Sequence, residues 1–219
     1  MKFTFLFILL FSIGLNAQSA TEISDKESMA LLEALKKDYD KYKAHRIDFT
    51  LDIELPGEGK ESQSGYLIQN GEKFILEMEA QKIISNNETV WVYLKDINEI
   101  QINDADFDED SDFMSPSSVF NMYNSDEFIF GASQHNYIKG ISITEIEAKP
   151  TDDYSEYSKV RITLAQKTNE FLQMKIFSRD GSRYTLNIDK HTKDYPVSTE
   201  LFVLDESQYE GVTIEDLRF

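Results

Sequence analysis

The spacing of apolar residues predicts a helix near the start of the chain. Between residues 25 and 43, apolar side chains recur every three or four positions, which is the period of an amphipathic helix. They are Met29, Leu32, Leu35, Tyr39 and Tyr42. Ser24 and Glu27 form a capping-box pattern just before this run and predict that the helix begins there.

The period then changes to two, which is typical of β-strands. Ile47, Phe49, Leu51, Ile53 and Leu55 alternate with polar residues and predict a strand with one apolar face. Turn-forming pairs such as Asn70-Gly71 and Asp180-Gly181 separate further short segments. These segments predict strands at residues 65–69, 73–79, 81–85, 89–94, 99–103, 141–148, 159–166, 171–178, 183–189 and 212–217.

Ser115-Pro116 has the form of an N-cap followed by proline, and it predicts a short helix at residues 116–123. One helix, about ten strands in hairpin succession and a short internal helix describe a strongly curved antiparallel sheet. The short helix is expected to cover its concave face. The chain has 219 residues, which favours one domain over two, so residues 18–219 are expected to form a single domain. We find no repeat of fixed period.

The first residues predict export from the cytoplasm. A short basic start is followed by an apolar run, residues 3–15, and by Ala17, a small residue that suits cleavage. This is the pattern of a secretory signal peptide covering residues 1–17, and the run is shorter than a membrane-spanning helix requires. We expect the mature chain to begin at Gln18, with Thr21 as the alternative start, and to be free in solution.

Charge and cysteine content narrow the choice of function. The chain has 40 acidic and 22 basic residues and a net charge of −18. Nucleic acid and anionic membrane surfaces would repel so acidic a protein. The chain has no cysteine, which excludes disulfides, thiol catalysis and thiolate metal sites.

No pattern of residues argues for catalysis or metal binding. The three histidines, His45, His135 and His191, lie in no metal-ligand spacing. The sequence contains no nucleophile-elbow or phosphate-loop motif. The acidic stretch 104–112 fails the EF-hand pattern, because glycine and glutamate are missing at the required places. We therefore expect no metal and no cofactor, although an enzyme built from scattered carboxylates stays open.

Aromatic residues are numerous, with 15 Phe and 11 Tyr. Some lie on predicted strands, and others gather around the predicted short helix. From the pattern alone, they form either an ordinary packed core or the wall of a lipid-binding cavity between sheet and helix.

Several segments resemble the LolA family of periplasmic lipoprotein carriers. They are AHRIDFTL at 44–51, GYL at 65–67, IISNNETVWVY at 83–93, SPSSVF at 115–120 and GVTIEDLR at 211–218. The third is the most specific and resembles the family's ISDGKTLWxY, with Asn86-Asn87 in place of Asp-Gly. The resemblance runs in order over nearly all of the mature chain and is closest to the acidic, longer members typical of Bacteroidetes.

The resemblance implies an unclosed antiparallel β-barrel, covered by the N-terminal helix and a short helical lid. Its apolar interior would hold the acyl chains of lipoproteins. The expected lining consists of Phe49, Leu51, Ile53, Phe74, Leu76, Met78, Trp91 and Tyr93. The expected lid consists of Val119, Phe120, Met122, Tyr123 and Phe128. The arginine that holds the lid in well-studied members is absent here, because its place falls at Asn70-Gly71.

The resemblance also implies partners and a location. A monomeric periplasmic carrier would take lipoproteins from an inner-membrane ABC transporter and deliver them to an outer-membrane acceptor. Two alternatives belong to other classes: a lipid-binding or envelope-stress-sensing protein of the same fold that shuttles nothing, and an enzyme acting on lipid or glycan. Bound lipoprotein, bound free lipid, or turnover would distinguish the three.

Overall fold

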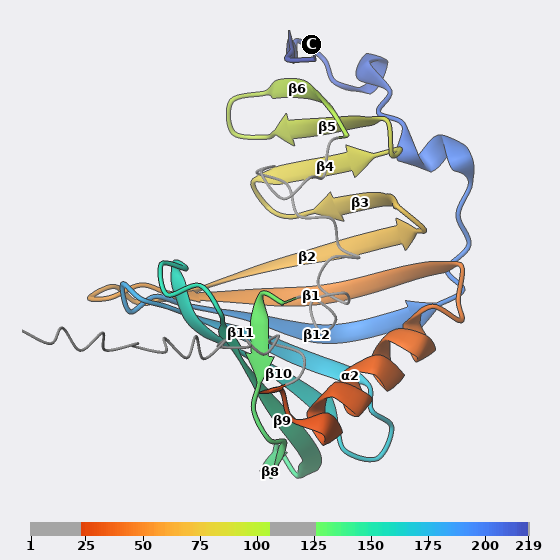
Figure 1. Cartoon of the computed structure of the whole chain (residues 1–219). Helices are drawn as coiled ribbons and strands as arrows, with labels where there is room; N and C mark the ends of the chain where they lie inside the picture. Colours follow the sequence, from red (N-terminus) through yellow and green to blue (C-terminus); the bar gives the residue numbers. More distant parts are fainter. Residues whose placement is uncertain (1–22, 106–125, 219) are drawn as a thin grey trace, which may run out of the picture.

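The computed structural model describes residues 23–105 and 126–218 (Figure 1). The elements in these ranges are α2 (Lys26–Tyr39), β1 (Ala44–Glu54), β2 (Lys60–Asn70), β3 (Lys73–Glu77), β4 (Gln81–Ser85), β5 (Thr89–Leu94), β6 (Glu99–Asp104), β7 (Phe128–Phe130), β8 (Gln134–Ile138), β9 (Ile141–Pro150), β10 (Tyr157–Ala165), β11 (Phe171–Ser178), β12 (Arg183–Lys193), the 3-10 helices η2 (Thr199–Phe202) and η3 (Glu206–Gln208), and β13 (Thr213–Asp216). The predicted signal peptide, the short helix at 116–123 and most of the acidic stretch lie outside the described residues.

The strands form one curved, unclosed sheet in the order β13-β6-β5-β4-β3-β2-β1-β12-β11-β10-β9-β7, with β8 also paired to β9. Neighbours from β6 to β7 pair antiparallel, so the predicted mainly β class with a curved antiparallel sheet is confirmed. Strand β1 lies in the middle and pairs with both β2 and β12.

Strand β13 differs from the antiparallel prediction, because it pairs parallel to β6. After β12, residues 195–212 run along one side of the sheet and reach its far edge, where β13 begins (Figure 1). This long connection lets the chain arrive in the same direction as β6, which a tight hairpin does not allow.

Helix α2 begins one residue later than the capping-box pattern indicates. Asp25 is the N-cap, and its carboxylate accepts a hydrogen bond from the Ser28 N–H at 2.9 Å. The Ser24 hydroxyl instead accepts from the Phe130 N–H of β7 at 3.0 Å, and the Ser28 hydroxyl donates to the Gly131 carbonyl at 2.7 Å. The start of α2 is therefore attached directly to the sheet edge.

The helix ends at Tyr39, four residues before the predicted end. Asp40 is the C-cap, and Ala44 already begins β1. Tyr42 therefore lies in the connection, although its spacing fits the helical pattern.

The two faces of the sheet bury different segments. We call the face that contacts α2 the helix-side face. On it, Leu32 of α2 packs in one core cluster with Phe130, Ile146, Ile162 and Leu164. We call the opposite face the tail-side face, because the C-terminal segment 195–212 covers its β2–β6 half. There the segment's buried Phe202 and Leu204 pack against the sheet's Ile68, Ile75, Ile84, Ile100 and Ile102.

The β2–β3 and β4–β5 turns form at the residues that the sequence marked. Gly71 adopts φ +60° and Asn87 φ +74°, the left-handed region that glycine and asparagine tolerate best. Strands β4, β5 and β11 have the predicted bounds. Strands β7 and β8 were not predicted, because β7 has only three residues and β8 is exposed throughout and has no apolar alternation.

Candidate functional site

The helix-side face is apolar on both sides of the central strand β1. On the β9–β12 side, cross-strand partners form one row that consists of Leu51, Leu186, Met174, Ile162 and Ile146. A second row consists of Ile53, Tyr184, Ile176, Val160 and Ala148. Ile146, Ile162, Val160 and Ala148 are buried in the cluster that contains Leu32 of α2.

The apolar surface continues across the β1–β5 side. Here a row of cross-strand partners consists of Ile47, Leu67, Leu76, Ile83 and Val92. Phe74 and Val90 lie beside this row and complete a third core cluster, against which Leu67, Leu76 and Leu94 pack half-buried. The helix-side face therefore offers apolar side chains from β9 to β5 without a charged row between them.

Most of the predicted lining residues lie together on this face. Phe49, Leu51 and Ile53 project from β1, and Phe74 and Leu76 project from β3. Met78 follows directly after β3, where its N–H donates to the Gln81 carbonyl at 2.9 Å. Phe49 and Phe74 are buried, whereas Leu51, Ile53 and Leu76 are half-buried.

Trp91 and Tyr93 lie on the opposite face from the other predicted lining residues. Trp91 is the cross-strand partner of Ile84, and both belong to the cluster beneath the C-terminal segment. The Tyr93 ring contacts the Tyr209 ring, with centroids 4.6 Å apart. Strand β5 carries buried or half-buried apolar side chains on both faces, so its sequence pattern alone does not assign a face.

The predicted lid residues are mostly outside the described ranges. Val119, Phe120, Met122 and Tyr123 lie there. Phe128 lies in strand β7, where it pairs with Pro150 of β9 and is buried beside Phe130, Tyr157 and the α2 cluster. Its place is thus in the core under α2, as part of the sheet.

Further residues of this face were not singled out from the sequence. Leu67, Met174, Ile176, Tyr184 and Leu186 extend the apolar rows. Their strands were predicted, but alternation within one strand does not reveal which strands are neighbours, or which of two apolar faces they share.

A polar group lies at the end of the helix-side face, next to the C-terminus of α2. His45 Nδ1 and His191 Nε2 are 2.9 Å apart. The Tyr39 ring stacks on the His45 ring at 3.7 Å, and its hydroxyl donates to Gln69 Oε1 at 2.6 Å. Lys193 Nζ contacts Asp38 Oδ2 at 2.8 Å and joins β12 to α2.

Burial controls the ionisation of this group. It lowers the pKa of the His45 imidazole. Burial, followed by the nearby His45 and Lys193, lowers the pKa of His191 from 6.5 to about 4. Burial likewise raises the pKa of the Tyr39 hydroxyl. The two imidazoles are therefore neutral at pH 7 and share one hydrogen bond.

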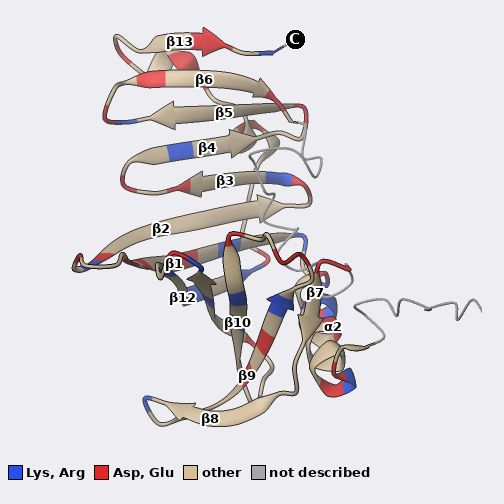
Figure 2. Ribbon diagram, turned by 60° about the vertical axis from the view of Figure 1, so that its left-hand side comes forward, with Lys and Arg blue, Asp and Glu red and all other residues tan. Residues whose placement is uncertain are grey.

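On the tail-side face, the β9–β12 half carries several charged residues. Lys159 and Arg161 of β10 each form a 2.7 Å ion pair with Glu147 of β9, and Figure 2 shows the acidic and basic segments side by side. Hydrogen bonds from Lys159 and Arg161 lower the pKa of Glu147. The part of this face around Glu147, Lys159 and Arg161 is therefore polar.

The described residues offer no arrangement for metal binding, since no three His, Cys, Asp or Glu side chains in them are placed to hold an ion. The acidic stretch, from residue 106 onward, lies outside them. Within the same ranges, no helix has the length and apolar character needed to cross a membrane. The helix-side face can bind an apolar ligand through the hydrophobic effect, without any chemical step.

These features define a curved-sheet protein with one large apolar face partly covered by a helix. The profile of the family described as "Outer membrane lipoprotein carrier protein LolA" matches residues 40–205. The chain belongs to this family. The search of curated proteins finds no match.

The chain is similar to several solved structures at low sequence identity. An uncharacterized conserved protein from Thermus thermophilus is 8% identical with a TM-score of 0.58, and the match covers 87% of this chain and 99% of that one. A LolA superfamily protein from Nitrosomonas europaea is 11% identical with a TM-score of 0.42, covering 86% and 99%. A DUF1329 family protein from Desulfovibrio piger is 14% identical with a TM-score of 0.48, covering 84% and 98%.

Proposed function

We propose that this protein is a periplasmic carrier that binds the acyl chains of lipoproteins on its helix-side face and shuttles them from the inner to the outer membrane. The observation that carries the proposal is the continuous apolar surface from β9 to β5, combined with membership of the LolA family. The signal peptide would direct export and would be cleaved near Ala17.

The free energy that opposes exposure of an acyl chain to water is large. Each buried CH₂ group contributes about 0.8 kcal/mol, so an acyl chain of about fifteen such groups contributes about 12 kcal/mol. A lipoprotein with two or three chains does not cross water unprotected. The half-buried Leu51, Ile53 and Leu76 supply apolar contact for the chains, with Phe49, Phe74 and Met78 beside them. The segment that holds Val119, Phe120, Met122 and Tyr123 would act as the lid.

The partners follow from the family. An inner-membrane ABC transporter of the lipoprotein-release type would supply the cargo, and an outer-membrane acceptor would receive it. The carrier would act as a monomer and without a cofactor. The net charge of −18 keeps it away from anionic membrane surfaces between these two contacts.

A binding experiment tests the proposal directly. The mature protein is mixed with a triacylated synthetic lipopeptide or with the same peptide lacking its acyl chains, and complexes are separated by size exclusion. We expect one lipopeptide to co-elute per protein and the deacylated peptide to elute alone. If neither peptide co-elutes, the carrier proposal is wrong. Equal retention of free fatty acid and lipopeptide favours the lipid-sensing alternative, and release of fatty acid from the lipopeptide favours an enzyme.

A pair of variants locates the binding surface. Leu76→Glu places a carboxylate at a half-buried position of the helix-side face, where it meets the acyl chains but stays partly hydrated. Leu55→Glu is the matched control, at a 37% exposed position just after β1. We expect Leu76→Glu to remain folded and lose lipopeptide, because a charge opposes acyl burial. Leu55→Glu should bind normally, and equal binding by both variants would remove Leu76 from the site.

Phe74 is unsuitable for this test, although it belongs to the predicted lining. Its side chain is only 3% exposed. Phe74→Glu would bury an unpaired carboxylate, and this costs several kcal/mol, comparable with the whole stability of a domain. We expect that variant to unfold, which would report on the core and leave cargo binding unmeasured.

A further inference from the structure

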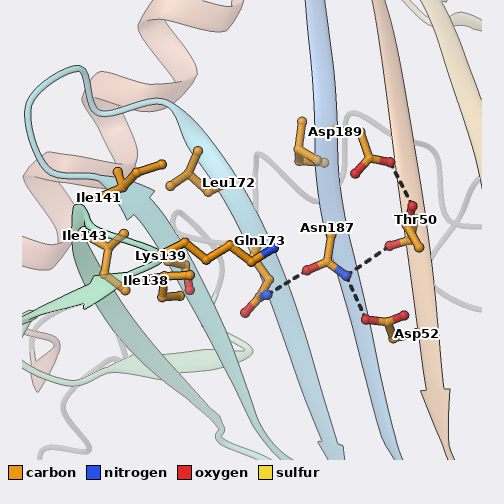
Figure 3. A pocket seen from close by; sticks show the side chains of 12 residues that line it. Thr50, Asp52, Ile138, Lys139, Ile141, Ile143, Leu172, Gln173, Asn187 and Asp189 are labelled. Carbon is orange, nitrogen blue, oxygen red and sulfur yellow. Dashed lines mark hydrogen bonds between the residues drawn. The ribbon is translucent and has the colours of Figure 1, made fainter. Parts of the chain in front are cut away.

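A second hollow lies on the tail-side face, away from the proposed acyl site. It has a volume of about 430 Å³ and lies between the tip of the β8–β9 hairpin and strands β10, β11, β12 and β1. Figure 3 shows its two unlike walls. Ile138, Ile141, Ile143 and Leu172 form an apolar wall, and amide, carboxylate and hydroxyl groups form the other.

The polar wall is held rigid by its own hydrogen bonds. Gln173 Nε2 donates to Asn187 Oδ1 at 2.7 Å. Asn187 Nδ2 donates to Asp52 Oδ2 at 3.0 Å, and the Thr50 hydroxyl donates to Asp189 Oδ2 at 2.8 Å. Side chains from β11, β12 and β1 therefore hold one another in fixed positions without a ligand.

One buried group in this hollow lacks a partner. Thr163 of β10 lines the hollow and is only 1% exposed. Its hydroxyl is the one buried side-chain polar atom of the described residues that makes no hydrogen bond. Buried polar groups nearly always form hydrogen bonds, so the unpaired Thr163 hydroxyl indicates that its hydrogen-bond partner comes from outside the folded chain. A ligand in the hollow would supply it.

The remaining free atoms define the chemistry of that ligand. Within residues 23–105 and 126–218, Gln173 Oε1 and Asp189 Oδ1 receive no hydrogen bond, so both can accept one. Among the described residues, Lys139 is the only ammonium group on the rim, and it forms no ion pair with any of them. Acceptors dominate, so the ligand must bring several hydrogen-bond donors, together with a non-polar surface for the isoleucine wall.

Other ligand classes fit less well. Phosphate needs several donors or cations, and the lining residues offer a single cation, Lys139, together with the carboxylates of Asp52 and Asp189. A metal ion needs free carboxylates, yet Lys60, Ser62 and Asn187 already engage Asp52. A lipid chain would leave the amide wall unpaired. A sugar ring has hydroxyls around its edge and C–H groups on its faces, and the volume suits one or two rings.

We propose that this hollow is a saccharide-binding site that takes a neutral mono- or disaccharide unit, with Thr163, Gln173 and Asp189 bound to its hydroxyls. The site lies on the opposite face from the proposed acyl site and does not depend on it. The protein would thereby recognise a glycan in addition to its acyl cargo.

The test uses the mature protein and three neutral disaccharides: cellobiose, maltose and N,N′-diacetylchitobiose. We expect at least one to cause saturable ¹H–¹⁵N shift changes at the amides of Thr163, Gln173 and Asn187. The Leu76→Glu variant should show the same changes, because it alters only the other face. Absence of saturable changes with all three, or changes confined to the helix-side face, would overturn the proposal. So would binding of inorganic phosphate at these amides in place of any sugar.

A matched pair of variants tests the unpaired hydroxyl. Thr163→Val keeps the shape and removes only the hydroxyl, which has no partner in the folded chain. We expect the melting temperature to stay the same or rise, and the saccharide affinity to fall about five-fold, the effect of one lost hydrogen bond. Thr144→Val is the control: Thr144 is also buried, on the adjacent strand β9, but belongs to the opposite face and contacts His135. It should leave the affinity unchanged. Equal affinity of wild type and Thr163→Val would contradict the assignment.

Discussion

Phe49 and Gly65 show how one residue pair shapes the helix-side face. They are directly opposite each other on β1 and β2. A Cβ atom on Gly65 would lie 2.7 Å from Phe49 Cζ and 2.6 Å from the Glu77 carbonyl oxygen. The ring of Phe49 thus occupies the space that the Cβ atom of any other residue at position 65 would need.

The first prediction follows from this contact. Gly65→Ala should lower the free energy of unfolding by about 1–3 kcal/mol, the usual effect of overpacking, because the backbone carbonyl of Glu77 cannot move aside easily. Denaturant unfolding measures the change. Gly59→Ala is the control, since nothing lies within 4 Å of its added Cβ, and it should change stability by less than about 0.5 kcal/mol. Equal changes in the free energy of unfolding would contradict the prediction and show that the Phe49 ring moves aside at little cost.

The sequence predicts that Gly65 begins a strand, but it does not reveal that this glycine makes room for the Phe49 ring. That role depends on a partner sixteen residues away in the chain, and the register that brings them together is a property of the paired strands. The same limit applies to Thr163, whose missing partner becomes visible only when its neighbours on β9 and β11 are in place.

Among the elements, those with regular alternation were predicted well. Strand β12 continues beyond its predicted end, and β1 begins three residues earlier than predicted but ends at Glu54, before Leu55. Strands β4, β5 and β11 match their predicted ranges. Their apolar side chains repeat with period two, because one face is buried. The edge strand β8 lacks this signature, since it gains its place by pairing with β9 and buries none of its residues.

The C-terminal segment 195–212 was unforeseen as a structural element. It contains only two short 3-10 helices, so periodicity does not reveal it. Yet it contributes Phe202, whose side chain is fully buried against the β2–β6 half of the tail-side face. Its presence explains why the tail-side face of β5, which carries Trp91 and Tyr93, is apolar in addition to the helix-side face.

The second prediction concerns this segment. Phe202→Ala should destabilise the protein by about 3–5 kcal/mol, because it opens a cavity in a core cluster. The neighbouring Leu201 is 39% exposed, and Leu201→Ala should cost less than about 1 kcal/mol. Thermal and denaturant unfolding of both variants measure the difference. Similar small effects would mean that the segment can detach without loosening the sheet.

At the scale of the whole molecule, the paired histidines make stability depend on pH. They join β1 to β12 and lie under the end of α2, where Asp38, Glu170 and Lys193 also face them. The folded pKa of His191 lies below its ordinary value of 6.5, so the unfolded chain binds more protons between pH 6.5 and about 4. Stability is therefore fully present above pH 6.5 and is lost as the pH falls toward 4.

The third prediction tests this dependence. The free energy of unfolding should decrease from pH 7 to pH 5 in the wild type, and His191→Gln should reduce the slope, because glutamine does not take up a proton. His135→Gln is the control, since His135 lies on the exposed strand β8, and its slope should equal that of the wild type. A wild-type stability that stays constant between pH 7 and pH 5 would contradict the prediction.

The position of β1 in the sheet has a consequence for how the chain folds. It is the first strand of the sequence, yet its partner β12 is the last long one, and the contacting His45 and His191 are 146 residues apart. Contacts of such high sequence separation slow folding, because a long loop must close before they form. A chain that emerges from a membrane pore with its N-terminus first would display β1 paired on one edge only. The apolar face of β1 and its unpaired edge would be prone to aggregation until nearly all of the protein had emerged.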